Sequence, residues 1–320
     1  MSQNIIIVAG DPNSINSEII FKTWKKLENK IKKKIYLIGN LRLINLQFKK
    51  LKYKIQLIEA DDKNRPINSN FLNIIDIPLI FKDPFNVSTN ESSKYVIKSL
   101  NLAHKLMLSK KYRGIINCPI NKQLLKKSKI IGVTEYLASM CKVNNHSEAM
   151  MIHNENLSVV PLTTHINIKD VSKNLNSSLI IRKVITVNKY FKKLFKKTPK
   201  IGVLGLNPHN GELIKSSEEI QKIIPALKVL KKKKVKIDGP LVSDTLFIDN
   251  FKKYDVIIGM YHDQVLGPFK SMFHFNAINI TLGLKYIRVS PDHGPAQDLI
   301  GKKKSNYLSL LKCVKFINNL

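Results

Sequence analysis

The sequence predicts an α/β protein with a mostly parallel sheet. Short runs rich in Ile, Val and Leu alternate with amphipathic stretches of helical length, as buried parallel strands alternate with their crossover helices. At 320 residues the chain has room for two domains of about 150 residues each. No apolar run reaches the ~20 residues of a membrane span, and no basic segment precedes the first strand as in a secretory signal.

Each element is expected from its local pattern. The strands are the apolar runs bounded by polar or turn-forming residues: 5–9, 34–38, 55–58, 114–117, 158–164, 201–206, 255–260, 277–281 and 286–289. The helices have apolar residues at every third or fourth position: 14–30, 88–109, 121–128, 134–142, 177–197, 216–234 and 307–317. Ser14 is expected to cap the first helix, and Ser88 or Thr89 the second.

Three of these strands are followed by a histidine: His165, His209 and His262. Ligands of open α/β sheets bind outside the carboxyl ends of the strands. Three neutral imidazoles at one such edge can hold a divalent metal ion. Their spacing matches no local metal motif, and each histidine alone also fits an ordinary surface or hydrogen-bonded role. The metal hypothesis therefore depends on their shared position.

Polar or turn-forming residues follow three further strands, at 10–12, 118–122 and 290–294. Gly, Pro, Asn and Asp are usual turn formers, so any one of these segments can be a simple turn. Their recurrence at one kind of strand end favours a site. The chain has no G-x-G-x-x-G fingerprint, no Walker A loop and no G-x-S-x-G elbow, so a nucleotide cofactor has to be held in another way.

The net charge of +31 invites a nucleic-acid function, but the composition argues against it. Only five of the 54 basic residues are arginines, and the abundance of Lys, Asn and Ile indicates an A+T-rich genome. We therefore expect no specific nucleic-acid partner and no membrane partner. The three cysteines, Cys118, Cys141 and Cys313, form no C-x-x-C pair and are typical of free thiols in a reducing cytoplasm.

A set of motifs runs in order from residue 10 to residue 301. They are Gly10-Asp11-Pro12 with Glu18, Pro119-Ile120-Asn121-Lys122, Thr163-Thr164-His165 with Lys169-Asp170, Asn207-Pro208-His209-Asn210-Gly211-Glu212, Gly239-Pro240-Leu241 with Asp244-Thr245, Tyr261-His262-Asp263-Gln264, and Thr281-Leu282-Gly283-Leu284 running on to Asp292-His293-Gly294. Together they resemble the 4-hydroxythreonine-4-phosphate dehydrogenase family of vitamin B6 biosynthesis.

The resemblance implies the isocitrate/isopropylmalate dehydrogenase-like fold, in which two α/β/α domains bind NAD without the Rossmann glycines. It implies a discontinuous cofactor-side domain of residues 1–125 and about 255–320. A central domain of about 126–254 would carry the dimer contacts. An obligate homodimer is implied as well, with a cleft at the subunit interface and metal ligands from both chains.

The family's functional residues map onto this chain by motif. The metal ligands correspond to His165, His209 and His262. The substrate-binding residues correspond to Thr134, Lys270, Asn279 and Arg288. The loop that meets the dinucleotide corresponds to His293, Gly294, Pro295, Ala296 and Asp298. Asp244, Asp263 and Lys270 are candidates for proton transfer, which the sequence does not rank.

The implied reaction is the NAD- or NADP-dependent oxidation of 4-phosphohydroxy-L-threonine at C3, then decarboxylation to 3-amino-2-oxopropyl phosphate. One divalent ion (zinc, magnesium or cobalt) would assist it. Val133 stands where the family usually has histidine, so a related acid such as threonate 4-phosphate is the alternative substrate. The loop at 13–17 also lacks the family's glycines and proline, which we expect to affect loop rigidity only.

Two other classes of protein compete with the dehydrogenase. A polyanion-binding protein explains the charge but not the histidines after the strands. A metal hydrolase explains the histidines but not the loop at 292–298. Hydride transfer separates these classes, because only a dehydrogenase produces NADH.

Overall fold

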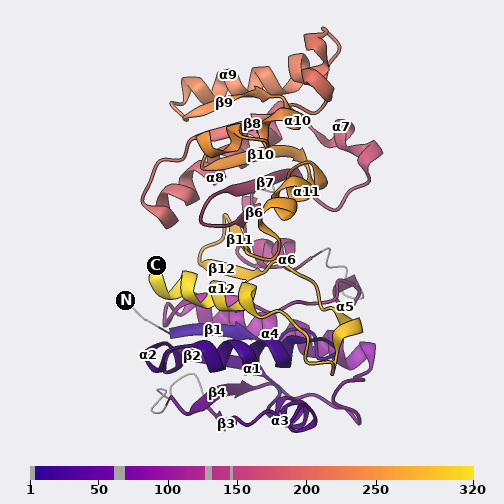
Figure 1. Cartoon of the computed structure of the whole chain (residues 1–320), viewed down its shortest axis with the longest axis vertical. Helices are drawn as coiled ribbons and strands as arrows, with labels where there is room; N and C mark the ends of the chain where they lie inside the picture. Colours follow the sequence, from indigo (N-terminus) through magenta and orange to yellow (C-terminus); the bar gives the residue numbers. More distant parts are fainter. Residues whose placement is uncertain (1–3, 61–68, 127–131, 145–146) are drawn as a thin grey trace. The chain divides into compact units, whose positions relative to one another are not determined.

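The computed structural model describes residues 4–60, 69–126, 132–144 and 147–320 (Figure 1). The chain forms two compact units. The first contains residues 1–142 and 284–320, and the second contains residues 143–283. Each has its own set of neighbouring strands and its own apolar core. The α/β class predicted from the sequence is confirmed.

The sheet of the first unit has the strand order β3-β4-β2-β1-β5-β12, and all its pairings are parallel. Its strands are β1 (Asn4–Val8), β2 (Ile35–Gly39), β3 (Gln56–Glu59), β4 (Phe71–Asp76), β5 (Tyr112–Asn117) and β12 (Ile287–Pro291). Its helices are α1 (Asn16–Lys26), α2 (Asn29–Lys32), α3 (Leu41–Lys50), α4 (Thr89–Leu108), α5 (Gln123–Lys126), α6 (Val133–Met140) and α12 (Leu308–Asn319), with a short 3-10 turn η6 (Gln297–Leu299).

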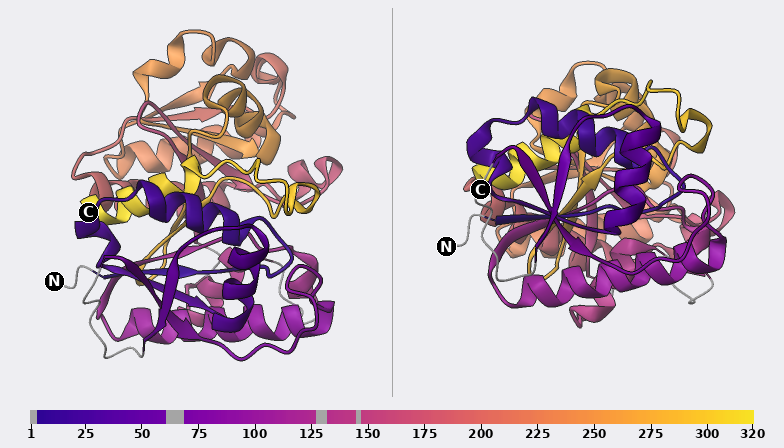
Figure 2. Two further views of the ribbon diagram at one scale, coloured as in Figure 1. Left: turned by 60° about the horizontal axis from the view of Figure 1, so that its bottom comes forward. Right: turned by 90° about the horizontal axis from the view of Figure 1, so that it is seen from below.

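Helices cover both faces of this sheet (Figure 2). α4 lies on one face, where Val96, Leu100 and Ala103 are buried against Ile6 and Ile115 of the central strands. α1 and α12 contact each other and lie on the other face. Because both faces are covered, the central strands are apolar on both sides, which explains why their runs are readable in the sequence.

The second unit has the strand order β11-β6-β7-β10-β8-β9. Its strands are β6 (Ala149–His153), β7 (Ser158–Thr163), β8 (Ile201–Leu204), β9 (Ile237–Leu241), β10 (Val256–Tyr261) and β11 (Ile278–Leu282). Its helices are α7 (Val171–Asn174), α8 (Ser177–Phe195), α9 (Ile224–Lys232), α10 (Ser243–Leu246) and α11 (His262–Phe273). Short turns η2 (Ile168–Asp170), η3 (Pro208–Leu213) and η5 (Asn250–Lys253) and a π-helical turn η4 (Glu219–Ile223) connect them.

β7, β10, β8 and β9 are parallel, whereas β6 is antiparallel to both of its neighbours. The core of this unit forms where Val265, Leu266 and Phe269 of α11 pack against Val159 and Ile257 of the sheet.

The units divide at 142/143 and 283/284, not near the expected positions 125 and 255. The reason is strand pairing. β10 lies between β7 and β8, and β11 pairs with β6, so residues 255–283 belong to the second unit. The expected discontinuity of the first unit is present, with a shorter C-terminal part.

Several expected elements differ in detail. The helix expected at 14–30 is two helices, α1 and α2, and that at 216–234 is the π-helical turn η4 followed by α9. Ser14 does not cap α1, which begins after Ile15; its hydroxyl donates to Asp11 O at 2.6 Å and accepts from Asn16 N at 3.1 Å. Ser88 caps α4 through Glu91 N, as predicted. The helix expected at 121–128 ends partly outside the described residues, and β4, β6 and β9 were not predicted.

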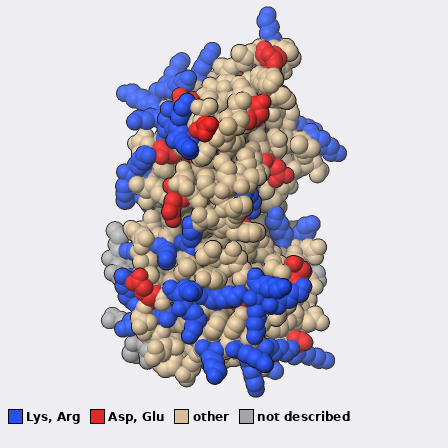
Figure 3. Space-filling model, in the orientation of Figure 1, with Lys and Arg blue, Asp and Glu red and all other residues tan. Residues whose placement is uncertain are grey.

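Basic side chains are spread over the face shown in Figure 3, with acidic side chains among them. They gather most densely over α1 of the first unit. Ion pairs such as Lys50–Asp83 and Lys94–Glu91 lie at the surface, where such pairs contribute little to stability. None of the described helices is long and apolar enough to cross a membrane.

Candidate active site

The three strands that precede the histidines are neighbours in the second unit, in the order β7-β10-β8. Because they are parallel, their carboxyl ends reach the same edge of the sheet. His165 and His262 face each other there, with ring centroids 6.1 Å apart and ring planes inclined by 36°. The expectation that these strand ends converge is therefore met for this pair.

His209 follows the third strand, on a turn that exposes its side chain to 67%. Its Nδ1 lies 3.1 Å from Glu212 Oε1, and its Nε2 lies 3.8 Å from Asp244 Oδ2. Asp244 comes from α10, so the structure places one of the candidate proton-transfer carboxylates beside a candidate metal ligand.

Carboxylates lie next to the ring nitrogens of His209 and His262. His262 Nδ1 lies 2.6 Å from Asp263 Oδ1, and His209 Nδ1 lies 3.1 Å from Glu212 Oε1. An ionised carboxylate only accepts, so Asp263 favours hydrogen on His262 Nδ1 and leaves the Nε2 lone pair of His262 for a ligand, whereas His209 has a carboxylate near each ring nitrogen. Metal-binding histidines are commonly oriented in this way. The donor chemistry of these residues therefore fits a divalent ion.

Within the described ranges, no three His, Cys, Asp or Glu side chains lie close enough together to hold an ion. The structure pairs His165 with His262 and holds His209 against Asp244 and Glu212.

Two further candidates lie in the second unit. Lys270 is half-buried on α11, eight residues after His262, which corresponds to about 12 Å along the helix axis. Asn279 lies on β11, and its Oδ1 is buried with no hydrogen-bond partner in the part of the chain that the structure describes. An unpaired buried amide oxygen costs about 1–3 kcal/mol, a cost that a bound donor removes.

Arg288 lies on β12 in the first unit and is 3% exposed. Its Nε donates to Asn117 Oδ1 at 2.6 Å, and its Nη1 donates to Thr134 Oγ1 at 3.3 Å. Burial lowers the pKa of the guanidinium to about 10, which leaves it charged at neutral pH. Two predicted substrate-binding residues, Arg288 and Thr134, are thus in direct contact.

Asn117 was not among the predicted site residues. It is the last residue of β5 and lies directly before the polar segment at 118–122. Its position at a strand end was the available signal, but its contact with Arg288 spans 171 residues of sequence.

The three polar strand ends of the first unit also meet, because β1, β5 and β12 are adjacent. Asp11, after β1, accepts from Asn13 N at 2.8 Å and from Asn121 N, after β5, at 3.3 Å. Burial raises the pKa of Asp11 to about 6, although both backbone hydrogen bonds act in the opposite direction. Pro295 O accepts from Ile15 N at 3.2 Å, so the loop after β12 packs on the first loop.

That loop contains the predicted dinucleotide residues. His293 Nδ1 lies 3.0 Å from Gly294 O, and Ala296 has a left-handed backbone with φ of 45°. Gly294 and Asp298 are exposed, whereas His293, Pro295 and Ala296 are half-buried.

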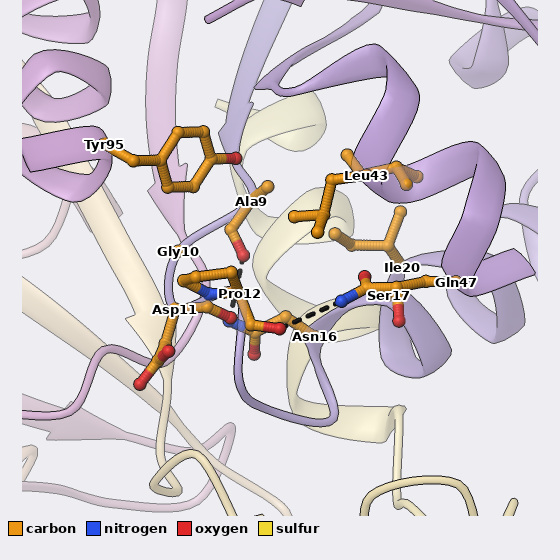
Figure 4. A pocket seen from close by; sticks show the side chains of 11 residues that line it. Ala9, Gly10, Asp11, Pro12, Asn16, Ser17, Ile20, Leu43, Gln47 and Tyr95 are labelled. Carbon is orange, nitrogen blue, oxygen red and sulfur yellow. Dashed lines mark hydrogen bonds between the residues drawn. The ribbon is translucent and has the colours of Figure 1, made fainter. Parts of the chain in front are cut away.

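A small pocket lies behind the first loop of this unit (Figure 4). Gln47 closes it from α3, donating to Pro12 O at 2.9 Å. Asn16 donates to Ala9 O at 2.9 Å, and within the described residues its Oδ1 and Ser17 Oγ have no hydrogen-bond partner. The hydrogen bonds from Gln47 and Asn16 hold the first loop in place beside this pocket.

Comparisons with known proteins show which family the chain matches. The family model described as pyridoxal phosphate biosynthetic protein PdxA matches residues 30–317. A 4-hydroxythreonine-4-phosphate dehydrogenase from Aquifex aeolicus is 38% identical over 100% of this chain and 99% of its own length. A D-threonate 4-phosphate dehydrogenase from Cupriavidus necator is 31% identical over 97% of this chain and 94% of its own.

Solved structures agree. A 4-hydroxythreonine-4-phosphate dehydrogenase from Klebsiella pneumoniae superposes with a TM-score of 0.86 at 27% identity, covering 99% of both chains. An isocitrate dehydrogenase from Methylococcus capsulatus has a TM-score of 0.51 at 10% identity, covering 100% of this chain and 85% of its own. This likeness concerns the fold alone, and it confirms the predicted isocitrate dehydrogenase-like fold.

Proposed function

The chain belongs to the PdxA family of pyridoxal phosphate biosynthetic proteins, and from that premise we propose that it is a dehydrogenase acting on 4-phosphohydroxy-L-threonine. The substrate is oxidised at C3 with NAD or NADP as the hydride acceptor, and the product loses carbon dioxide to give 3-amino-2-oxopropyl phosphate. The observation that carries the proposal is the 38% identity over the whole chain to a relative of that name.

We propose that His165, His209 and His262 hold one divalent ion, with both subunits of a homodimer contributing ligands. The support is their place after three neighbouring strands and the Asp263 carboxylate, which leaves the Nε2 lone pair of His262 available. When bound, the ion supplies Lewis acidity to the C3 oxygen of the substrate. Imidazole ligands favour zinc or cobalt over magnesium, which prefers oxygen ligands.

The remaining residues bind the substrate and move protons. Arg288 and Thr134 offer charged and hydroxyl donors suited to phosphate or carboxylate oxygens. Lys270 and Asn279 supply a second cation and an amide. Asp244 and Asp263 contact the proposed metal ligands, so they are placed to accept a proton from the substrate hydroxyl.

We propose that the dinucleotide binds along residues 292–298, with His293, Gly294, Pro295, Ala296 and Asp298 in contact. The packing of Pro295 on the first loop through Ile15 supports a fixed position for this segment.

A second copy of the chain completes the proposed site. Five apolar side chains on segments close in sequence to the histidines or to Asp244 are between 41% and 74% exposed: Ile166, Ile168, Leu213, Ile214 and Ile248. Exposed apolar residues near a site favour a protein interface.

The three cysteines are free and buried, which fits a reducing cytoplasm.

The test is NADH or NADPH absorbance with purified dimer, added zinc, cobalt or magnesium, and 4-phosphohydroxy-L-threonine. We expect turnover that disappears with a chelator and returns with metal. Absence of turnover with every metal and both dinucleotides would refute the proposed reaction.

D-threonate 4-phosphate is a second candidate substrate, favoured by one observation. Val133 begins α6 and packs against the apolar core of the first unit, beside the Thr134 that contacts Arg288. The chain therefore has an apolar side chain where the family usually has an imidazole. Comparing kcat/KM for the two acids in wild type and Val133→His decides between them: a reversal of preference in the variant would assign substrate choice to this position.

A further inference from the structure

The turn that carries His209 has an unusual backbone. Five consecutive residues, from His209 to Leu213, have positive φ angles of 48°, 58°, 60°, 47° and 54°. This is a left-handed turn, which costs about 1–2 kcal/mol per residue other than glycine. Only Gly211 in this run is free of that cost. Such a backbone persists only where its surroundings fix it.

Glu219 is the group that fixes the entry to this turn. It belongs to η4 and is fully buried, at 0% exposure. Its Oε1 accepts from Leu206 N at 2.7 Å and Asn207 N at 2.9 Å, and its Oε2 accepts from Asn207 Nδ2 at 2.9 Å. Burial acts to raise the pKa of this carboxyl, but the hydrogen bonds from Asn207 and Leu206 leave the pKa below its usual value. The buried carboxylate is thus stabilised by donors from the chain just before His209.

The sequence leaves room for this carboxylate on both sides of the turn. A Cβ at Gly205 would lie 3.0 Å from Glu219 Oε1 and 2.2 Å from Asn210 Oδ1. A Cβ at Gly211 would lie 3.0 Å from Glu219 Oε2 and 2.9 Å from Ser217 Cβ. Because both glycines border the same carboxylate, the turn closes around Glu219.

The same network reaches the strands that precede the other two histidines. Gln264 Nε2 donates to Gly205 O at 2.7 Å, and its Oε1 accepts from Met260 N at 2.7 Å. Thr163 Oγ1 donates to Met260 O at 2.7 Å. Hydrogen bonds therefore link the ends of β8, β10 and β7 in turn, and Glu219 anchors the end of β8.

We propose that Glu219 is a positioning residue that holds the left-handed turn so that the His209 imidazole is pre-set to bind the divalent ion. The inference rests on the proposed metal-dependent function. Residues that orient metal ligands without touching the metal typically contribute 10–100-fold to metal affinity. Glu219 acts through the backbone of the turn and does not itself contact substrate or ion.

The test replaces Glu219 by glutamine and measures Co²⁺ affinity of the metal-free dimer by calorimetry and by visible absorption. Glutamine has nearly the same shape, but only one of its two terminal atoms accepts: when its oxygen accepts from the backbone N–H groups of Leu206 and Asn207, its NH2 group faces Asn207 Nδ2 as donor against donor. We expect the Kd for Co²⁺ to rise about 10–100-fold, with kcat returning to within a few-fold of wild type at saturating metal. Recovery with metal separates positioning from simple loss of folded protein.

The matched control is Asp255→Asn. Asp255 also accepts a backbone N–H, from Lys200 at 2.9 Å, but at the opposite ends of the same strands. We expect its Kd for Co²⁺ to stay within about two-fold of wild type. Equal Co²⁺ affinity in Glu219→Gln and wild type would overturn the positioning role. Failure of wild type itself to bind Co²⁺ would refute the proposed metal site instead.

If Glu219→Gln does not fold, Asn207→Ala decides. It removes the Nδ2 donor and keeps the two backbone hydrogen bonds to the carboxylate. The Kd for Co²⁺ should then rise by a smaller factor, of about three- to ten-fold. An unchanged Kd in a folded Asn207→Ala dimer would count against the proposal.

Discussion

Arg288 offers the sharpest test of how the first unit binds substrate. Arg288→Lys keeps the positive charge but removes the planar fork whose Nε and Nη1 donate to Asn117 and Thr134. A lysine ammonium is a single donor centre at the end of a flexible chain. It cannot reach both acceptors and a substrate oxygen with the same geometry.

The magnitude follows from these contacts. Hydrogen bonds to a charged donor contribute about 1.5–3 kcal/mol each, and a buried acceptor left unpaired costs about 1–3 kcal/mol. Because Arg288 is 3% exposed, water does not replace the lost donor at Asn117. We expect a loss of stability of about 2–4 kcal/mol. If the fork also grips the phosphate, kcat/KM should fall about 100-fold, which corresponds to ~2.7 kcal/mol.

The assay compares Arg288→Lys with Arg182→Lys. Arg182 donates to Ser178 on the exposed surface of α8, a contact that a lysine can replace at little cost. Tm and kcat/KM are measured for both variants as confirmed dimers, below the lower Tm. Equal, near-wild-type kcat/KM for the two variants would show that Arg288 does not bind the substrate.

Three further predictions concern the metal, pH and charge. His209→Ala should abolish metal-dependent turnover while leaving the circular dichroism spectrum unchanged. The control His104→Ala, which loses a contact with Tyr286 in the first unit, should keep metal-dependent turnover. Full turnover of His209→Ala without excess metal would contradict the ligand assignment. Burial raises the pKa of Asp11 from 3.8 to about 6, so between these pH values the carboxyl is protonated in the folded protein and ionised in the unfolded chain. As the pH rises from 4 to 6, the free energy of unfolding should therefore fall by up to about 3 kcal/mol. Asp11→Asn should therefore gain stability relative to wild type between pH 4 and 7 in urea unfolding, and parallel pH profiles would refute this. Binding to DNA or RNA should be weak, independent of sequence and lost at physiological salt in a filter-binding titration; tight, sequence-selective binding there would overturn the enzyme-only interpretation.

The parts of the fold that the sequence predicts are those set by apolar pattern. The strands expected at 5–9, 201–206 and 255–260 lie within two residues of β1, β8 and β10, because each is buried on both faces. β9 was missed because Asp238, Gly239 and Pro240 interrupt an edge strand with turn-forming residues. The antiparallel direction of β6 leaves no trace in composition, since a buried apolar run reads alike in either direction.

Some residues of the candidate site could likewise be predicted from the sequence, and others could not. The convergence of His165 and His262 was predictable because each follows a readable strand. The role of Glu219 was not predictable from the sequence, because a glutamate at the start of a helical stretch is usually exposed. Glu219 is buried because the left-handed turn at 209–213 closes around it. Before Gly211, no residue type in the sequence predicts that left-handed backbone.

This difference has a physical origin. Apolar burial is non-directional, so it decides that β7, β10 and β8 are neighbours but not how the segments after them are oriented. Orientation comes from hydrogen bonds, whose strength falls steeply with angle. In the second unit those bonds come from the side chains of Thr163, Gln264 and Glu219, which join the three strand ends in sequence. The apolar core should therefore tolerate conservative substitutions that leave turnover intact, whereas isosteric changes in these three polar side chains should alter metal binding with little effect on the fold.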